Sequence, residues 1–174
     1  MSGAGRPRYE TEVDLQREYA VAAAVCAADA VAPTESRLLS WYKLPAQYGQ
    51  YCDIVFCRHQ SIVCYAEVKC RPSIQEWDAA RPPHHVVLSC HKWHNGISFA
   101  RSMQRNWMLI VATHAGIYGL TINPAAQVPK YKQVIGGRMQ SRRDEADVEP
   151  VVCLPYADFT LLCQTPHELF STPE

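Results

Sequence analysis

The sequence predicts a mixed α/β (α+β) fold, in which helices pack on a mixed central β-sheet. Helical periodicity over residues 11–30 comes first, and a second helical pattern over 90–105 lies between groups of extended segments. Residues 51–71 read as two strands that are apolar on both faces, which is typical of strands in the middle of a sheet. The resulting order is αβββαβ with extra C-terminal strands.

The chain of 174 residues is long enough for one domain with a proper core, which we place at 9–165. Residues 1–8 are expected to be disordered, and 166–174 to form a tail. No apolar run is long enough for a membrane span, and the first residues lack the apolar core of a secretory leader. We therefore expect a cytoplasmic protein without membrane contact, in the host cytoplasm if the chain is viral.

The first predicted helix carries apolar residues at helical spacing from Leu15 to Ala30 and is expected to end before Pro33. Glu18 borders this buried stripe, and its structural reading is a glutamate at the solvated edge of the helix. A first strand is predicted over 37–42. The two strands of the central hairpin follow at 53–57 and 62–69.

Beyond the hairpin, Ser73 and Glu76 have the spacing of a capping box and predict a short helix that ends before Pro82. An extended segment over 86–88 leads to Ser89, the predicted N-cap of a helix that runs to about Arg105. The remaining predicted strands cover 107–112, 117–122, 151–154 and 159–162. Residues 123–150 are polar and rich in turn formers, which indicates a long hairpin or a flap.

Symmetry of the hairpin about Gln60 would place its residues in definite pairs. Asp53 then faces Glu67, Val55 faces Tyr65, and Cys57 faces Val63. Lys69 follows Glu67 on the same face, about 7 Å farther along the strand. Three ionisable groups therefore end a row of otherwise apolar side chains.

Two carboxylates this close repel one another unless a cation neutralises them or one keeps its proton. The oxygens of Asp53 and Glu67, with the carbonyl of Val68, suit a hard cation such as Mg²⁺ or Mn²⁺. A lysine beside such a cation can orient or deprotonate water and stabilise charge on a phosphate. The structural alternative is an acid pair at a sheet end that Lys69 neutralises.

Asp53 followed by Glu67-Val68-Lys69 resembles the core motif of the PD-(D/E)XK nuclease superfamily, which has the restriction-endonuclease-like fold. The resemblance covers about residues 10–122, and the segments SCHKWHNGISFA and 148–155 resemble small phage-type members. Cys52 stands where this superfamily usually has proline. The resemblance implies DNA as substrate, Asp53 and Glu67 as metal ligands and Lys69 as the catalytic lysine. It also implies an outer ligand on the first helix, Glu18, for which Glu10 and Glu12 are rivals.

Several basic side chains are candidates for binding DNA, although the formal net charge is zero. His91 and Lys92 lie in the first turn of the second main helix, where phosphate binds readily; a solvated first turn is the alternative. The basic side chains of 138–143 fit a DNA-gripping flap, or they pair with the acids that follow at 144–147. They are Arg138, Arg142 and Arg143.

The eight cysteines are expected to be reduced and to pack as small apolar groups, because none has Cys-x-x-Cys spacing. Cys90 and His94 lie one helical turn apart and could face one zinc ion. Three hypotheses follow. The first is a metal-dependent deoxyribonuclease, the second is an inactive DNA-binding module of the same fold, and the third is a zinc-stabilised structural protein. Dimerisation would suit a nuclease that cuts both strands, but the sequence identifies no interface.

Overall fold

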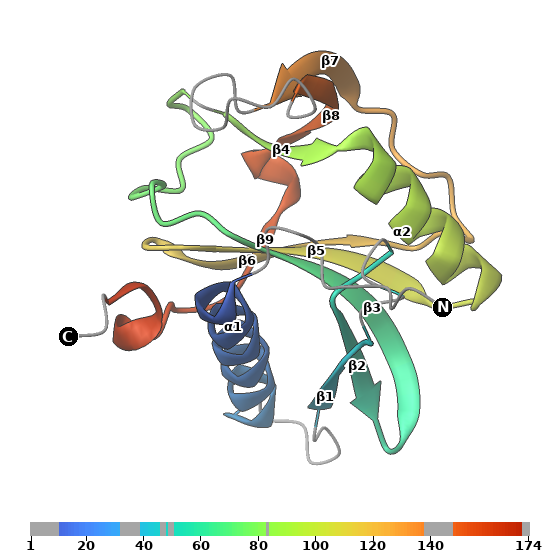
Figure 1. Cartoon of the computed structure of the whole chain (residues 1–174), viewed down its shortest axis with the longest axis vertical. Helices are drawn as coiled ribbons and strands as arrows, with labels where there is room; N and C mark the ends of the chain where they lie inside the picture. Colours follow the sequence, from blue (N-terminus) through green and yellow to red (C-terminus); the bar gives the residue numbers. More distant parts are fainter. Residues whose placement is uncertain are drawn as a thin grey trace.

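A six-stranded mixed sheet forms the centre of the molecule. The computed structural model describes residues 11–31, 39–45, 48, 51–82, 84–137 and 148–171. Within these ranges the sheet has the strand order β1-β2-β3-β5-β6-β9 (Figure 1). Its strands are β1 (Leu39–Lys43), β2 (Ile54–Arg58), β3 (Ser61–Cys70), β5 (Asn106–Thr113), β6 (Gly116–Ile122) and β9 (Thr160–Cys163).

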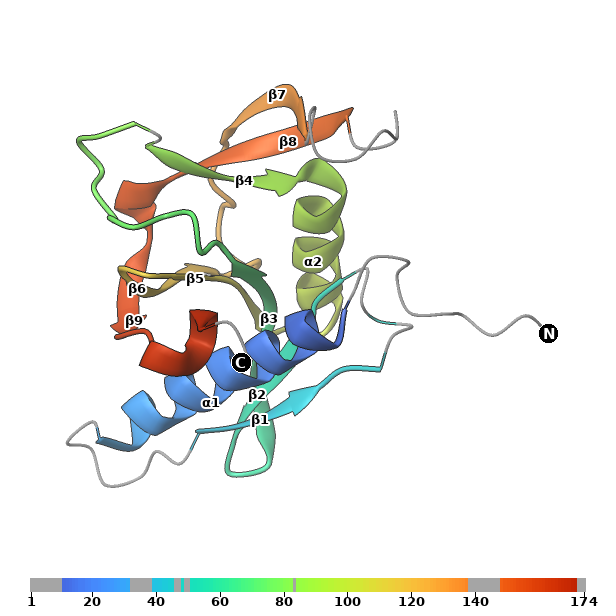
Figure 2. The same cartoon turned by 60° about the vertical axis from the view of Figure 1, so that its left-hand side comes forward.

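A smaller antiparallel sheet has the order β4-β8-β7. Two α-helices and two short 3-10 helices complete the described part of the chain. Helix α1 and the last 3-10 helix lie on one side of the central sheet, and α2 lies on the other side with the second sheet (Figures 1 and 2). These elements are β4 (His85–Ser89), β7 (Lys132–Gly137), β8 (Val148–Pro155), α1 (Glu12–Val31), α2 (Cys90–Ser102), η3 (Tyr156–Asp158) and η4 (His167–Phe170).

Each face of the central sheet has its own apolar core, because side chains alternate along a strand. On the α1 side, Val21 and Ala22 pack with Ala66 and Val68 of β3. On the α2 side, Trp93 packs in one cluster with Tyr65, Trp107 and Val111. The predicted mixed α+β fold is therefore confirmed, and the hairpin β2–β3 lies inside the sheet with β1 and β5 as its outer neighbours.

The β2–β3 hairpin turns through His59 and Gln60, which both have positive φ angles of 49° and 63°. Two such residues form the type I′ turn that suits a two-residue hairpin. Val55 pairs with Tyr65 as predicted. The predicted pairing of Cys57 with Val63 is wrong, because an irregularity between Phe56 and Cys57 shifts the register and Cys57 pairs with Ile62.

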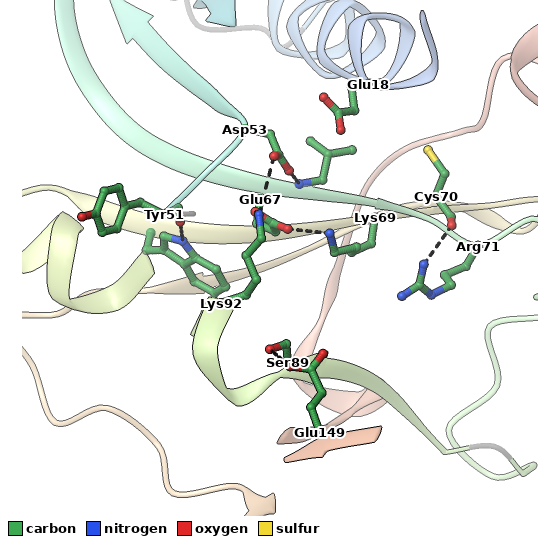
Figure 3. Close-up of polar contacts among 12 residues, drawn as sticks. Glu18, Tyr51, Asp53, Glu67, Lys69, Cys70, Arg71, Ser89, Lys92 and Glu149 are labelled. Atoms are coloured by element: carbon green, nitrogen blue, oxygen red, sulfur yellow. Dashed lines mark hydrogen bonds and ion pairs between the residues drawn. The ribbon is translucent and has the colours of Figure 1, made fainter. Parts of the chain in front are cut away.

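Strand β3 runs parallel to β5, with Glu67 opposite Leu109. A parallel pair needs a crossover, and this one passes through β4 and α2 before it returns to β5. Strand β4 pairs with β8 in the second sheet rather than joining the central one. The crossover therefore brings the first turn of α2 to the same end of the sheet as the charged residues of β3 (Figure 3).

Residues 73–80 form no helix, contrary to the capping-box prediction. The Ile74 carbonyl accepts a hydrogen bond from the His114 amide, so it is not used within a helix. Trp77 stacks on Tyr118 and on Tyr156, with ring centroids 4.1 Å away in each case. These contacts with distant parts of the chain outweigh the local preference for a helix.

Helix α2 begins where the sequence predicts, with Ser89 at the N-cap position, but it ends earlier than predicted. Ser89 makes no capping hydrogen bond with its side chain. Its Oγ instead donates to Glu149 Oε2 at 2.6 Å, which ties the helix start to β8. The helix ends at Ser102, before the predicted Arg105, and Gln104 has a positive φ of 53°.

The region 123–150 contains β7 and the start of β8, which pair antiparallel and form a long hairpin. The connection between these strands lies outside the described residues, and so do Arg138, Arg142 and Arg143. Pro33 and Glu10 lie outside them as well. In the part of the chain that is described, no helix is long and apolar enough to cross a membrane.

All eight cysteines are free, as the sequence predicts. Burial raises the pKa of Cys52 and of Cys64 to about 12. A thiol that keeps its proton at neutral pH is a poor nucleophile and a poor metal ligand, so these two side chains act as small apolar groups.

Candidate active site

Asp53 and Glu67 meet at one end of the central hairpin (Figure 3). Asp53 directly precedes β2 and is 8% exposed, whereas Glu67 in β3 is fully buried. The backbone of β3 holds the aspartate on two sides. The Asp53 amide donates to the Ala66 carbonyl at 2.8 Å, and Asp53 Oδ2 accepts from the Val68 amide at 2.9 Å. The position of this carboxylate is therefore fixed by main-chain groups that no side-chain substitution removes.

Two lysines from different elements converge on this acid pair. Lys69, two residues beyond Glu67 in β3, places Nζ 2.5 Å from Glu67 Oε1. Lys92, in the first turn of α2, places Nζ 2.9 Å from Glu67 Oε2 and 3.9 Å from Asp53 Oδ1. Both lysine side chains are about a quarter exposed. The site is thus a cluster of four ionisable groups that reaches solvent where its two lysine side chains are exposed, which we call its open side.

The two acids differ in their electrostatics. Burial and the neighbouring Glu67 charge raise the pKa of Asp53 to about 7, despite the nearby lysines. Burial would also raise the pKa of Glu67, but Lys69 and Lys92 outweigh it and hold that pKa below its ordinary value. Burial would lower the pKa of Lys69, but Glu67 and Asp53 overcome this effect and raise it. At neutral pH, Glu67 is therefore an anion, Lys69 is a cation, and Asp53 is close to its titration midpoint.

Glu18 approaches the same end of the sheet from the α1 side (Figure 3). It forms an ion pair with Lys43 of β1, and its side chain is 13% exposed. Its charge also contributes to the raised pKa of Asp53. Glu12 is exposed at the first position of α1. Glu10 lies outside the described residues, so of the two described candidates, Glu12 and Glu18, it is Glu18 that lies beside the acid pair.

The acid pair can hold a hard divalent cation. The N–H of Val68 points toward Asp53, and the N–H and C=O of a strand residue point to the same side, so the Val68 carbonyl also faces this end. The Lys92 ammonium, in reach of both carboxylates, demonstrates that a positive charge is accommodated between them. Two carboxylates, a carbonyl and water are the ligands that Mg²⁺ and Mn²⁺ prefer.

Among the described residues, no group of three or more His, Cys, Asp or Glu side chains is arranged to hold a metal ion. Cys90 is buried at the start of α2 and His94 is exposed one turn later. The zinc hypothesis therefore has no three-ligand cluster in the described structure.

The two residues predicted to bind phosphate at the start of α2 lie in different surroundings. His91 is exposed, and its Nε2 lies 2.9 Å from Asn95 Nδ2 one turn farther along the helix. Lys92 enters the acid cluster instead. Sequence reasoning missed this contact because Lys92 and Glu67 are 25 positions apart, and the chain between them includes an irregular segment whose course is not set by local pattern.

Sequence reasoning also missed Lys43. It ends β1 opposite Ile54, and the next residue, Leu44, donates its amide proton to the Asp53 carbonyl at 3.0 Å. A lysine at the end of a strand is usually a solvated residue. The β1–β2 register could have identified Lys43, because it pairs this lysine with Ile54, the residue that follows Asp53.

A family model described as "Phage putative PDDEXK endonuclease" matches residues 4–162, which include every element of the site. No curated protein and no solved structure matches the chain.

Proposed function

Because the chain belongs to this phage PDDEXK endonuclease family, we propose that it hydrolyses phosphodiester bonds of DNA at the Asp53–Glu67 pair. The observation that carries the proposal is the convergence of two buried carboxylates and Lys69 at one open end of the sheet. Buried charges of like sign are costly. Their presence at the end of an otherwise apolar hairpin supports use in a reaction rather than in folding.

Asp53 and Glu67 would hold a Mg²⁺ or Mn²⁺ ion together with the Val68 carbonyl, and Glu18 would act as an outer ligand directly or through water. Such an ion supplies a Lewis acid that activates water and offsets charge on a phosphate. The Val68 amide keeps the Asp53 carboxylate in place through its 2.9 Å hydrogen bond. Lys43 orients Glu18 through their ion pair.

Lys69 would act as a cation. Its pKa is raised by Glu67 and Asp53, so it keeps its proton at neutral pH in the metal-free protein. From its position beside Glu67, the ammonium can donate a hydrogen bond to the attacking water or to a phosphate oxygen and stabilise the charge that develops on phosphorus. This role requires a positive charge at position 69 but no proton acceptor.

DNA would reach the site from its open side, where backbone phosphates are bound by basic side chains. Lys92 and His91 are at the start of α2, close to the reacting phosphate in this arrangement. Arg138, Arg142 and Arg143, which follow β7 in the sequence, would bind further backbone phosphates. As a member of a phage family, the enzyme would act in the host cytoplasm.

A cleavage assay tests the proposal. Linear and circular DNA are incubated with the wild-type protein in Mg²⁺, in Mn²⁺ or in EDTA, and beside it with the Asp53→Ala and Lys69→Ala variants. We expect cleavage by the wild type in either metal, none in EDTA, and a loss of about 10³-fold or more in each variant. Cleavage that survives both substitutions would exclude this site.

A matched control separates loss of chemistry from loss of structure. Lys132 is an exposed lysine of the second sheet, and Lys132→Ala should cleave like the wild type. Salt-sensitive DNA binding by the wild type without metal-dependent cleavage would favour the inactive DNA-binding module instead.

A further inference from the structure

We infer that Lys92 is a built-in competitor for the metal: it occupies the Asp53–Glu67 pair in the metal-free protein and leaves it for a DNA phosphate when the metal binds. This inference rests on the proposed function and adds to it an order of binding. It starts from one contact set, in which the Lys92 ammonium lies 2.9 Å from Glu67 Oε2 and 3.9 Å from Asp53 Oδ1.

The charge balance of the cluster requires a rearrangement. Two carboxylates and two ammonium groups already balance when Asp53 is ionised. A divalent cation added to this set would leave an excess of two positive charges at a largely buried site, which is unfavourable without compensation. Departure of one lysine removes half of this excess, and the arrival of a phosphate diester removes the other half.

Lys92 is the lysine that the geometry selects to leave. Lys69 stands on β3 itself and contacts Glu67 Oε1, the oxygen that Lys92 does not use. Lys92 belongs to another element and is in reach of an oxygen of each carboxylate, so its ammonium lies where a shared cation would lie. Its long side chain is partly exposed and can turn toward solvent without movement of the helix.

A phosphate bound near the start of α2 can become the new partner of the released Lys92 ammonium. The first turn of a helix favours anions, because its N–H groups and dipole point outward. A phosphate bound at the open side of the site therefore meets both this helix end and the Lys92 ammonium. Metal and DNA would then strengthen one another's binding. The metal displaces Lys92 from the carboxylates, so its ammonium becomes available to the phosphate. A phosphate that holds this ammonium in turn keeps the carboxylates open to the metal.

Calorimetry with Mn²⁺ and no DNA tests the competition without any catalytic step. We compare the wild type with Lys92→Met, which keeps the length of the side chain, and with Lys92→Gln, which keeps a hydrogen bond to Glu67. Both variants should bind Mn²⁺ about tenfold more tightly than the wild type, within the usual range of coupling between two ligands. The control Lys132→Met should bind like the wild type.

Thermal unfolding gives a second measurement that needs neither a calorimetric titration nor DNA. In the absence of metal, Lys92→Gln should have a lower Tm than the wild type, since Glu67 loses one of its two cations. Added Mn²⁺ should raise the Tm of this variant more than that of the wild type. If Lys92→Met does not fold, Lys92→Gln alone decides the question.

Each outcome separates this inference from the proposed function. Mn²⁺ binding that Asp53→Ala abolishes, with equal or weaker affinity in both Lys92 variants, would overturn the inference and leave the metal site intact. Binding by the Lys92 variants but not by the wild type would be its strongest support. If none of the proteins binds Mn²⁺, both proposals are overturned.

The transfer to phosphate has its own measurement. Binding of a short DNA duplex is measured with and without Ca²⁺, a hard divalent cation that takes oxygen ligands. Ca²⁺ should tighten binding by the wild type several-fold more than binding by Lys92→Gln. An equal effect of Ca²⁺ on the two proteins would overturn the transfer of Lys92 to DNA.

Discussion

Gly96 of α2 lies directly against the indole of Trp107 in β5. A Cβ atom added to Gly96 would lie 2.2 Å from Trp107 Nε1 and 2.8 Å from the Tyr51 carbonyl oxygen. The same Nε1 donates a hydrogen bond to that oxygen at 3.4 Å. This contact sets the distance of α2 from the sheet and from the loop that leads to Asp53.

Gly96→Ala should therefore destabilise the protein by about 2–3 kcal/mol, the usual cost of overpacking a well-filled core. Because Trp107 and the Tyr51 carbonyl must shift, we also expect weaker metal binding at Asp53. Urea unfolding measures the first effect and calorimetry the second. The control is Ser98→Ala, an exposed change in the same helix that should alter stability by less than about 0.5 kcal/mol. Equal stability of the two variants would contradict the packing seen here.

Asp53→Asn should stabilise the metal-free protein at about pH 8 and leave it unchanged near pH 4. The pKa of Asp53 is raised from 3.8 to about 7, so the folded state binds a proton that the unfolded state has released. The contribution of Asp53 to stability is therefore present below the lower pKa and is lost as the pH rises through the higher one. The gain at high pH is at most about 4 kcal/mol, from three pKa units.

The measurement is the free energy of unfolding in urea as a function of pH, with EDTA present. Only the difference between the wild type and Asp53→Asn is interpreted, because other groups titrate in both proteins. A difference that stays constant across this range would show that the aspartate is ionised throughout. The variant should also fail to cleave DNA, so its greater stability would accompany a loss of activity.

Glu67→Gln should have the opposite effect on stability. This buried carboxylate neutralises Lys69 and Lys92, and its loss leaves two partly buried ammonium groups without their main counter-ion. We expect a loss of about 2–4 kcal/mol at neutral pH, measured by urea unfolding without metal. Glu76→Gln provides the comparison, since the exposed Glu76–Arg81 pair at 2.7 Å should contribute under about 1 kcal/mol. Similar losses in the two variants would mean that burial adds nothing to the Glu67 contacts.

Glu18→Gln should reduce metal-dependent cleavage by about 10- to 100-fold, the usual effect of losing an outer partner of a metal ligand. Glu12→Gln, an exposed change six positions earlier on the same helix, should leave the rate unchanged. Initial rates at saturating metal separate the two. A rate loss in Glu12→Gln alone would move the outer ligand to the start of the helix.

The central hairpin could be predicted from sequence because its pattern is local. Alternating apolar residues gave both strands, and one symmetric register placed Asp53 near Glu67. The error at Cys57 also has a local cause, since a bulge next to a tight turn changes the register without changing the apolar pattern. The same pattern could not reveal which oxygens contact which lysine.

Local sequence patterns could not predict the contacts between segments that are distant in the chain. The stacking of Trp77 on Tyr118 and Tyr156 keeps its segment out of a helix, and no local feature of the capping box reveals this. The second sheet likewise depends on the pairing of β4 with β8, which are far apart in sequence. Lys92 belongs to this class, since its approach to Glu67 depends on the course of the whole crossover.

The type I′ turn at His59 and Gln60 also has a consequence for the route by which the chain folds. A two-residue turn closes at a lower entropic cost than a crossover that separates its partners by 25 positions. We therefore expect the hairpin contacts to form before the contacts of Lys92. Asp53 and Glu67 then meet before Lys92 arrives. The chain thus brings two like charges together early with Lys69 as their one local counter-charge, and it adds the second cation late. Dissolved divalent ions and salt should therefore speed the folding of this protein more than they slow its unfolding.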